Sequence, residues 1–523
     1  METSLLLHRL YGQALNNCPG KTAVVCGDKS CTYGELEQTS ELYARALRSI
    51  GIGRSDLVGI FCSNRIEFVW LYLACFRIGA VAVPISAFSR APEIVHDVEH
   101  SGLRVFLFSH DLETEVRGLR KAVPALREVL VIDGPACETG ESWQALVGRA
   151  AALPPTDDSD VRESDPAVVM YTSGSTSRPK GVTHTHGTLY RAASSRCATL
   201  HHNSRTVALS AGQLSHAAAV GIAFIPMLMA CGTSVFLPLW WDAAAFCNAI
   251  EGHGVTDSWM LPAQAIEFTL HPQAQTTRYD SLEFCQAGGD VITRDLQERF
   301  RKITGRELRP SLGMTECFAY MTVPPSEPPR RGALGKPFVG VEIRLVDPDG
   351  REVPPGTPGE ISVRSGAVMV GYWNDPETTA TVIVDGWLRT GDIARRDEDG
   401  YYCFIGRIKD MIVRGGGNVG PGEVEDALCE HPAVSRCGVI GVPDGQGSET
   451  VQAFVVLSRD AETKPTVQEL AWFVEGKLSA RKIPEFWTFV DELPLTGMGK
   501  VDRKALRPLV ERLRASTVRL ALS

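Results

Sequence analysis

The stretch YTSGSTSRPKGV, residues Tyr171–Val182, contains two glycines, two threonines, three serines and one lysine. It follows the apolar run AVVM, which is typical of a buried strand. Glycines let a backbone wrap around an anion, hydroxyl groups donate hydrogen bonds, and Lys180 supplies a positive charge. Because glycine rather than serine or threonine follows Lys180, the stretch is not a Walker P-loop. Two interpretations remain: a phosphate-binding loop and a solvated surface loop.

Helical and strand patterns alternate on both sides of this loop. Residues 41–52 have the apolar spacing of an amphipathic helix, and residues 56–62 (DLVGIFC) are typical of a buried strand. The same style recurs between residues 201 and 310, with short strand patterns such as VALS and LEFCQAGG. Alternation at this spacing predicts an α/β fold on a mainly parallel sheet.

The character of the chain changes twice after Gly332. Strand patterns and the turn signals DPDG, PPG and TPG then predict a small antiparallel β unit. From Asp410 to the end, the chain is mixed α/β with its own apolar periodicity, about the size of one small domain. We therefore place a domain boundary near Lys409. We also expect the basic amphipathic tail, residues 506–523, to form a terminal helix.

The composition of the chain excludes several classes of protein. Its 523 residues carry a net charge of −9 with both signs interspersed, which argues against nucleic acid as a partner. The 14 cysteines show no zinc-type spacing and are too sparse for a disulfide scaffold, so we expect reduced thiols in the cytoplasm. The longest apolar run, residues 217–231, is too short to span a bilayer, and the N-terminus does not resemble a signal peptide. We expect a soluble protein.

Further motifs follow the first in a fixed order: SLGMTEC (Ser311–Cys317), LRTGDIA (Leu388–Ala394), GRIKD (Gly406–Asp410) and PLTGMGKVDRKAL (Pro494–Leu506). With YTSGSTSRPKGV, this ordered set resembles the adenylate-forming superfamily of acyl-CoA synthetases, carrier-protein adenylation domains and luciferases. The resemblance covers essentially the whole chain. It implies a large N-terminal AMP-binding domain, residues 1–408, of two α/β subdomains and a small β-barrel at about 332–405. It also implies a small, mobile α+β C-terminal domain, residues 409–523, with its hinge at Lys409.

The resemblance implies that the opening stretch is a phosphate loop, which grips the β- and γ-phosphates of ATP. Thr315 would contact the α-phosphate, and Glu316 would hold Mg²⁺ together with Thr176. The implied ATP-binding set is Thr172, Ser173, Gly174, Ser175, Thr176, Lys180, Gly288, Gly289, Asp290, Leu312, Gly313, Met314, Thr315, Asp392, Arg407 and Lys500.

Within this set, Asp392 would accept hydrogen bonds from the ribose hydroxyls with the assistance of Arg407. Lys500 would bridge the attacking carboxylate and the α-phosphate. Each of these residues has a plainer interpretation when taken singly, as a turn cap, a surface ion pair or a solvated charge. The implied catalytic residues are Lys500, Thr315, Glu316 and His216.

The implied reaction needs no nucleophilic side chain. A carboxylate attacks the α-phosphorus of ATP, pyrophosphate leaves, and a thiol then attacks the acyl-adenylate and releases AMP. Fixed cations and hydrogen-bond donors supply most of the catalysis, because charge builds on phosphate oxygens. Rotation of the C-terminal domain would withdraw Lys500 and bring Gly416 to the edge of a pantetheine tunnel. The run GGGNVG at 415–420 also matches a dinucleotide fingerprint, which we reject because Pro421 and Gly422 interrupt the helix that should follow.

The acid would bind beside QLSHAAAVGIAF, in which His216 matches a frequent gate residue of the family and is otherwise a core histidine. Amino-acid-activating relatives place an aspartate where this chain has alanines, so an amino acid is not expected as substrate. Small side chains here leave room for a bulky or ring-containing acid, but tight helix packing explains them equally well. The implied pocket residues are His216, Ala217, Val220, Gly221, Ala287, Gly313 and Met314.

Two positions depart from the family pattern. Ser177 replaces a glycine of the phosphate loop, and Leu312 replaces the aromatic ring that usually stacks on adenine. Neither change removes a charge. His184 and His186 lie at alternate positions but lack a third metal ligand nearby, so we interpret them, like His201–His202, as structural or surface residues.

The leading hypothesis is an acid–CoA ligase that uses ATP, Mg²⁺ and CoA. The second is an adenylating enzyme that passes its acyl group to the pantetheine of a carrier protein in natural-product biosynthesis. A free-standing chain without a carrier domain slightly favours CoA. A non-catalytic nucleotide sensor and an ADP-forming kinase are weaker alternatives. The sequence names neither the acid nor the oligomeric state, and a homodimer is one open arrangement.

Overall fold

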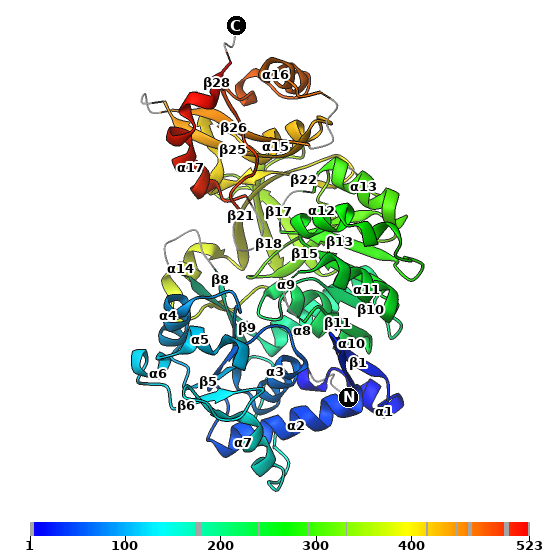
Figure 1. Cartoon of the computed structure of the whole chain (residues 1–523), viewed down its shortest axis with the longest axis vertical. Coiled ribbons are helices and arrows are strands. Elements are labelled where there is room, and N and C mark those ends of the chain that lie inside the picture. Colours follow the sequence, from blue (N-terminus) through cyan, green and yellow to red (C-terminus); the bar gives the residue numbers. More distant parts are fainter. Residues whose placement is uncertain are drawn as a thin grey trace.

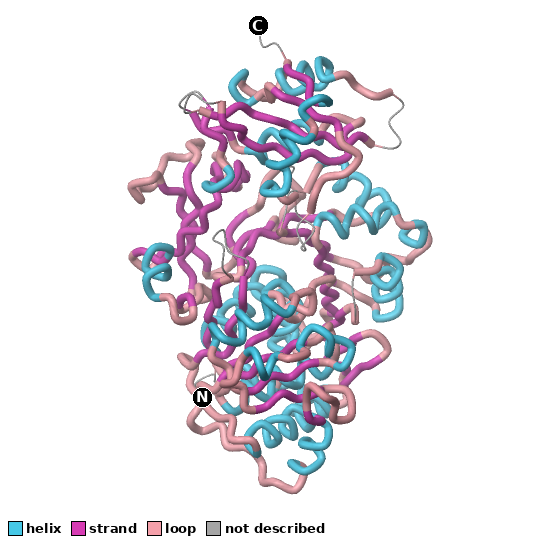
Figure 2. Tube along the Cα trace, turned by 60° about the vertical axis from the view of Figure 1, so that its left-hand side comes forward, coloured by secondary structure: helices cyan, strands magenta, loops and turns pink. Residues whose placement is uncertain are grey.

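Two mainly parallel sheets form the larger part of the chain in the computed structural model (Figure 1). The sheets are flanked by helices (Figure 2), and the C-terminal elements lie at the opposite end of the long axis from α2 and α7 (Figure 1). The structure describes residues 5–172, 179–238, 241–289, 292–330, 332–414, 417–444, 448–458, 463–495 and 501–520.

Among the described residues, the first sheet has eight strands in the order β19-β9-β8-β4-β3-β5-β6-β7. Strands β3 to β8 run parallel, and β9 returns antiparallel to β8. The parallel strands are buried on both faces, which explains their continuous apolar runs. The strands are β3 (Leu57–Phe61), β4 (Val81–Ile85), β5 (Val105–Phe108), β6 (Glu128–Val131), β7 (Glu141–Ser142), β8 (Pro166–Thr172), β9 (Lys180–Thr185) and β19 (Gly371–Tyr372).

The second sheet has nine strands in the described part of the chain, in the order β16-β15-β14-β13-β12-β10-β11-β1-β2. Its central strands are parallel, and β2, β15 and β16 pair antiparallel at the two edges. The strands are β1 (Thr22–Cys26), β2 (Lys29–Thr32), β10 (Val207–Ser210), β11 (Thr233–Phe236), β12 (Asp257–Met260), β13 (Phe284–Gly288), β14 (Leu308–Met314), β15 (Phe318–Thr322) and β16 (Lys336–Pro337).

The helices between these strands begin and end at recognisable signals. Thr32 and Glu35 form a reciprocal capping box at the start of α2, and α3 ends where Gly79 takes a φ of 69°. The helices of this part are α1 (Gly12–Asn17), α2 (Tyr33–Ser49), α3 (Ile66–Ile78), α4 (Ala91–Ser101), α5 (Glu113–Val116), α6 (Leu119–Ala122), α7 (Trp143–Ala150), α8 (His186–Leu200), α9 (Ala217–Ala219), α10 (Ile225–Ala230), α11 (Ala243–His253), α12 (Pro262–Leu270) and α13 (Arg294–Thr304).

An antiparallel sheet follows, as the turn-rich sequence after Gly332 predicts. It contains β17 (Val341–Val346), β18 (Gly359–Ser365), β20 (Ile383–Val384), β21 (Trp387–Arg396) and β22 (Tyr402–Arg407), with α14 (Pro376–Val382) beside it. The short strand β19 departs from this unit. Gly371 and Tyr372 pair instead with Thr183 and Val182 of β9, so this segment is joined to the eight-stranded sheet. The predicted barrel limits, 332–405, stay a prediction.

The C-terminal part contains a four-stranded sheet in its described residues, with helices packed on it. The described part of the GGGNVG run includes β24 (Gly417–Val419), which pairs antiparallel with β23 (Ile412–Arg414), and α15 begins at Pro421. Pro421 therefore starts a helix that we expected it to interrupt, because proline is tolerated at the first helical position. The elements are α15 (Pro421–Cys429), β25 (Val434–Pro443), β26 (Glu449–Leu457), α16 (Val467–Glu475), β27 (Phe486–Phe489), α17 (Arg503–Arg512) and β28 (Thr517–Arg519).

The C-terminal tail is only partly helical. Helix α17 ends at Arg512, and residues 517–519 form β28, which pairs antiparallel with β27. The expectation of a single terminal helix over 506–523 is therefore wrong, because β-branched Thr517 and Val518 complete a sheet edge instead.

The observed architecture is the predicted fold class, a mixed α/β chain with a separate small C-terminal domain. The boundary and hinge at Lys409 stay predictions. Among the residues that the structure describes, no helix combines the length and the apolarity that a membrane span requires.

Candidate active site

The predicted phosphate loop connects two paired strands. Thr172 ends β8, Lys180 begins β9, and the two residues face each other in the antiparallel register. The predicted contacts Ser173, Gly174, Ser175 and Thr176, with the departure at Ser177, lie outside the described residues.

The turn between β14 and β15 carries Thr315 and Glu316 and is held from several sides. His184 of β9 lies 2.8 Å from the Thr315 carbonyl oxygen through its Nε2 atom. The backbone N–H of Met369 donates to the Glu316 carbonyl oxygen at 2.7 Å. The Tyr372 hydroxyl donates to Glu316 Oε1 at 2.9 Å. The β9 and β19 segments therefore fix the position of the turn.

Glu316, Tyr372 and Lys180 form one electrostatic group. The Lys180 Nζ atom lies 5.1 Å from the centroid of the Tyr372 ring, within cation–π range. Burial raises the pKa of Glu316, and the Tyr372 hydroxyl and the charge of Lys180 oppose this rise. A bound cation would favour the ionised carboxylate further. A half-buried carboxylate beside the predicted phosphate loop suits Mg²⁺, which takes one or two protein carboxylates together with substrate phosphates.

Asp392 and Arg407 are directly opposite each other on β21 and β22. Arg407 Nε donates to Asp392 Oδ1 at 3.1 Å, and the backbone N–H of Asp392 donates to Thr390 Oγ1 at 3.1 Å. Asp392 is 6% exposed, whereas the Arg407 side chain is 43% exposed. The structure thus brings together the two residues that were predicted to contact ribose.

The remaining described residues that we predict to bind the nucleotide lie at the ends of two neighbouring parallel strands, β13 and β14. Gly288 pairs with Ser311 across these strands, and a Cβ atom on Gly288 would lie 2.2 Å from the Ser311 carbonyl oxygen. This position requires glycine, because the two backbones approach too closely for a side chain. Gly289 follows β13, whereas Leu312, Gly313 and Met314 lie on β14.

The predicted acid pocket begins at α9. His216 caps this helix, and its Nδ1 atom accepts a hydrogen bond from the Ala218 N–H at 3.2 Å, which places the proton of the neutral ring on Nε2. Ala217, Val220 and Ala287 are buried. After α9 the helix widens into a π-turn over Val220–Phe224.

At Gly221 the structure favours the packing interpretation of the small residues. A Cβ atom there would lie 2.3 Å from Cδ1 of Phe318, so the missing side chain makes room for a ring that is itself buried. The small size of Gly221 is thus explained without any ligand.

We expect Gly221→Ala to lower the free energy of unfolding by about 1–3 kcal/mol, because the added methyl group overpacks the contact with Phe318. Denaturant unfolding measures this loss. Gly252→Ala is the matched control, since a Cβ atom at Gly252 in α11 would meet nothing within 4 Å. An equal effect of both substitutions would contradict the overpacking argument.

The remaining predicted site residues either lie between the antiparallel sheet and the C-terminal elements or fall outside the described residues. Lys409 lies in the short 3₁₀ turn Ile408–Asp410 between β22 and β23, and its role as a hinge stays a prediction. The predicted residues Asp290, Gly416 and Lys500 lie outside the described residues.

Sequence reasoning missed two residues that contact the site. Tyr372 lies in a two-residue strand and belongs to no recognisable motif. His184 was interpreted only as a structural or surface residue. His184 and His186 do point to different partners, since His186 Nδ1 accepts a hydrogen bond from the backbone N–H of Leu7. Their alternation across the junction of β9 and α8 was the one available signal.

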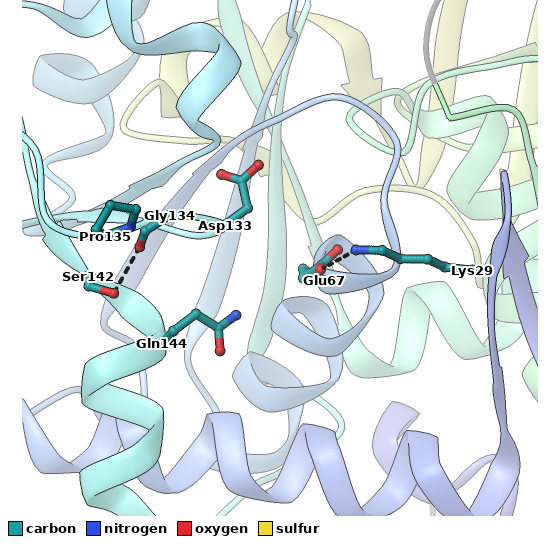
Figure 3. Close-up of a pocket in the computed structure, with 7 residues that line it drawn as sticks. All are labelled: Lys29, Glu67, Asp133, Gly134, Pro135, Ser142 and Gln144. Carbon is teal, nitrogen blue, oxygen red and sulfur yellow. Dashed lines mark hydrogen bonds and ion pairs between the residues drawn. The ribbon is translucent and has the colours of Figure 1, made fainter.

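A separate cleft of about 440 Å³ lies beside β2, α3 and the β6–β7 connection (Figure 3). Figure 3 shows the Lys29 ammonium directed at the Glu67 carboxylate, at a distance of 3.4 Å. Asp133 and Gln144 also line this cleft. It contains no residue predicted to bind ATP or the acid, so we place the active site at the Thr315–Glu316 turn instead.

The fold and this site define an adenylate-forming enzyme. Residues 12–373 match the model of the AMP-binding enzyme family, and residues 423–500 match that of the AMP-binding enzyme C-terminal domain. The chain therefore belongs to the AMP-binding enzyme family, and the resemblance seen in the sequence is confirmed.

Relatives of known function are similar along nearly the whole chain. A feruloyl-CoA synthase of Amycolatopsis sp is 35% identical over 491 residues, covering 94% of this chain and 96% of that protein. The fatty acid–[acyl-carrier-protein] ligase ScoC of Streptomyces coeruleorubidus is 30% identical and covers 94% of this chain and 93% of its own. The anthranilate CoA ligase AuaEII in complex with anthranoyl-AMP has a TM-score of 0.87 at 26% identity, covering 97% and 98% of the two chains. These similarities confirm the predicted class, an AMP-forming acid–thiol ligase.

Proposed function

We propose that the chain is an ATP-dependent ligase that joins an aromatic carboxylic acid to CoA. The observation that carries the proposal is the grouping of Thr315, Glu316, Lys180 and Tyr372 at the mouth of the predicted phosphate loop. Among the relatives, one is named for feruloyl-CoA and one structure holds anthranoyl-AMP. Both names concern aromatic acids, which supports a ring-containing substrate.

In the first step, the carboxylate of the acid attacks the α-phosphorus of ATP and pyrophosphate leaves. Lys180 would neutralise charge on the departing phosphates, and Thr315 would donate to the α-phosphate as charge builds there. Asp392 would fix the ribose hydroxyls, with Arg407 keeping its carboxylate in place. When bound, Mg²⁺ supplies positive charge to the phosphates, and Glu316 and Thr176 are the residues that would hold it.

In the second step, a thiol attacks the acyl carbonyl and AMP leaves. We propose CoA as the thiol donor and a rotation about Lys409 that exchanges Lys500 for Gly416 at the site. ScoC supports a second candidate, in which the acceptor is the pantetheine of a carrier protein. An amino acid substrate is not proposed, because the helix after His216 offers alanines where an ammonium group would need a carboxylate.

We further propose a cytoplasmic enzyme, because all 14 cysteines are free thiols. A homodimer stays a prediction.

Mass spectrometry of reactions with ATP, Mg²⁺ and a panel of ferulate, anthranilate, benzoate, octanoate and phenylalanine tests the proposal. We expect AMP and a CoA thioester with one or more of the aromatic acids. Thioester on a pantetheinylated carrier protein but not on CoA would favour the second candidate. Preference for octanoate or phenylalanine would contradict the aromatic substrate, and ADP as product would contradict the ligase.

A further inference from the structure

His184 occupies a fully buried position on β9, and both of its ring nitrogens have partners. Its Nε2 atom lies 2.8 Å from the carbonyl oxygen of Thr315, and its Nδ1 atom lies 3.1 Å from Thr188 Oγ1. The ring also packs on Phe318, with centroids 4.6 Å apart. One side chain thus contacts both ends of the Thr315–Phe318 turn and the first turn of α8.

The partners fix the tautomer of this ring. A carbonyl oxygen can only accept, so Nε2 carries the proton and donates to Thr315. Nδ1 is then an acceptor, and the Thr188 hydroxyl, 3.1 Å away, can donate to it in place of its other acceptor, the Thr185 carbonyl oxygen at 3.2 Å. Burial lowers the pKa of His184 to about 4, so the ring is neutral under physiological conditions. A neutral ring with one donor and one acceptor matches this pair of partners.

The placement of His184 links two parts of the site that are distant in sequence. Lys180 begins the same strand, four positions before His184, and Thr315 begins the turn that carries Glu316. A change in the His184–Thr315 hydrogen bond would shift that turn relative to the strand that bears Lys180. The predicted α-phosphate contact and the predicted magnesium carboxylate would move together.

We propose that His184 is a positioning residue for the adenylation step, which holds the Thr315–Glu316 turn in register with the phosphate loop. This role rests on the proposed function. His184 is fully buried, and it acts through the Thr315 carbonyl. Because positioning errors of about 1 Å can cost about 100-fold in rate, one buried hydrogen bond at this point has a large effect on catalysis.

Two similar substitutions separate positioning from packing. The amide of glutamine in His184→Gln reaches the place of Nε2 and can donate to Thr315, whereas the shorter amide in His184→Asn can replace only Nδ1. Both variants keep a polar side chain in the same buried site. A packing role predicts similar losses for the two, and a positioning role predicts that only glutamine preserves activity.

The experiment measures the two half-reactions separately, with an acid that the unmodified enzyme accepts. ATP–pyrophosphate exchange reports adenylation, and conversion of supplied acyl-AMP with CoA reports thioester formation. We expect His184→Asn to lower the exchange rate by about 10- to 100-fold and to lower thioester formation much less, because acyl-AMP lacks the β- and γ-phosphates that the loop would hold. His184→Gln should restore most of the exchange rate.

His186→Gln is the matched control in the same segment, because His186 is also buried but bonds to Leu7. It should lower thermal stability without changing exchange relative to thioester formation. Equal exchange rates in the His184→Asn and His184→Gln variants, or parallel losses in both half-reactions, would overturn the proposal. If the unmodified enzyme shows no exchange with any acid, that result would contradict the proposed function. The inference about His184 would then be contradicted as well.

Discussion

Replacement of Glu316 by glutamine is expected to lower the adenylation rate by about 100-fold or more. Glutamine keeps the shape of the side chain and its contact with the Tyr372 hydroxyl, but it removes the negative charge beside Lys180. Among the described residues, the Glu316 carboxylate is the one best placed to hold Mg²⁺ against the phosphates. ATP–pyrophosphate exchange measured across a series of Mg²⁺ concentrations tests this, and we expect a higher Mg²⁺ requirement as well as a lower maximum.

The chain contains a closely matched control for this substitution. Glu327 also accepts a hydrogen bond from a tyrosine hydroxyl, that of Tyr401, and pairs with Lys336 at 2.9 Å. Lys336 Nζ lies 4.6 Å from the Tyr401 ring centroid, so this trio has the same three residue types outside the predicted site, with a direct lysine–glutamate bond in addition. Glu327→Gln should leave exchange and its Mg²⁺ dependence unchanged. Equal effects of the two substitutions would show that Glu316 acts through local stability and not through the metal.

The Asp392–Arg407 pair shows what the sequence could predict about this site. The two residues lie 15 positions apart, in motifs separated by a short turn-rich connection, and antiparallel pairing of β21 with β22 brings them together. When two motifs lie on consecutive strands that pair with each other, their order in the sequence is enough to predict that they are close in space. The same reasoning places Lys180 opposite Thr172, since both flank one loop.

Tyr372 shows what the sequence could not predict. Its strand is two residues long, too short for any periodic pattern, and it leaves the antiparallel unit to pair with β9. Such a contact depends on how two sheets meet, which local patterns do not encode. The same holds for His184, whose partners Thr188 and Thr315 come from α8 and from the second sheet. The prediction of a helix beyond Arg512 was wrong for a related reason. The spacing of apolar residues there is helical, but residues 517–519 pair with the edge of a sheet.

Lys500→Ala is expected to lower adenylation by about 100- to 1,000-fold and to spare thioester formation from supplied acyl-AMP. The resemblance places this lysine between the attacking carboxylate and the α-phosphate, so its charge matters only in the first step. The chain on either side of residues 496–500 is anchored in the C-terminal domain. Leu495 forms a β-bridge with Val501, and Asp502 caps α17 by accepting from the N–H groups of Lys504 and Ala505.

The proposed rotation about Lys409 predicts a large difference between the two half-reactions, since it would remove Lys500 from the site before the thiol arrives. Lys504→Ala is the control, because it removes an equal charge from an exposed position of α17, four residues further on. It should leave both half-reactions unchanged. Equal losses in both half-reactions of the Lys500→Ala variant would contradict the rotation, because the lysine would then serve the second step as well as the first.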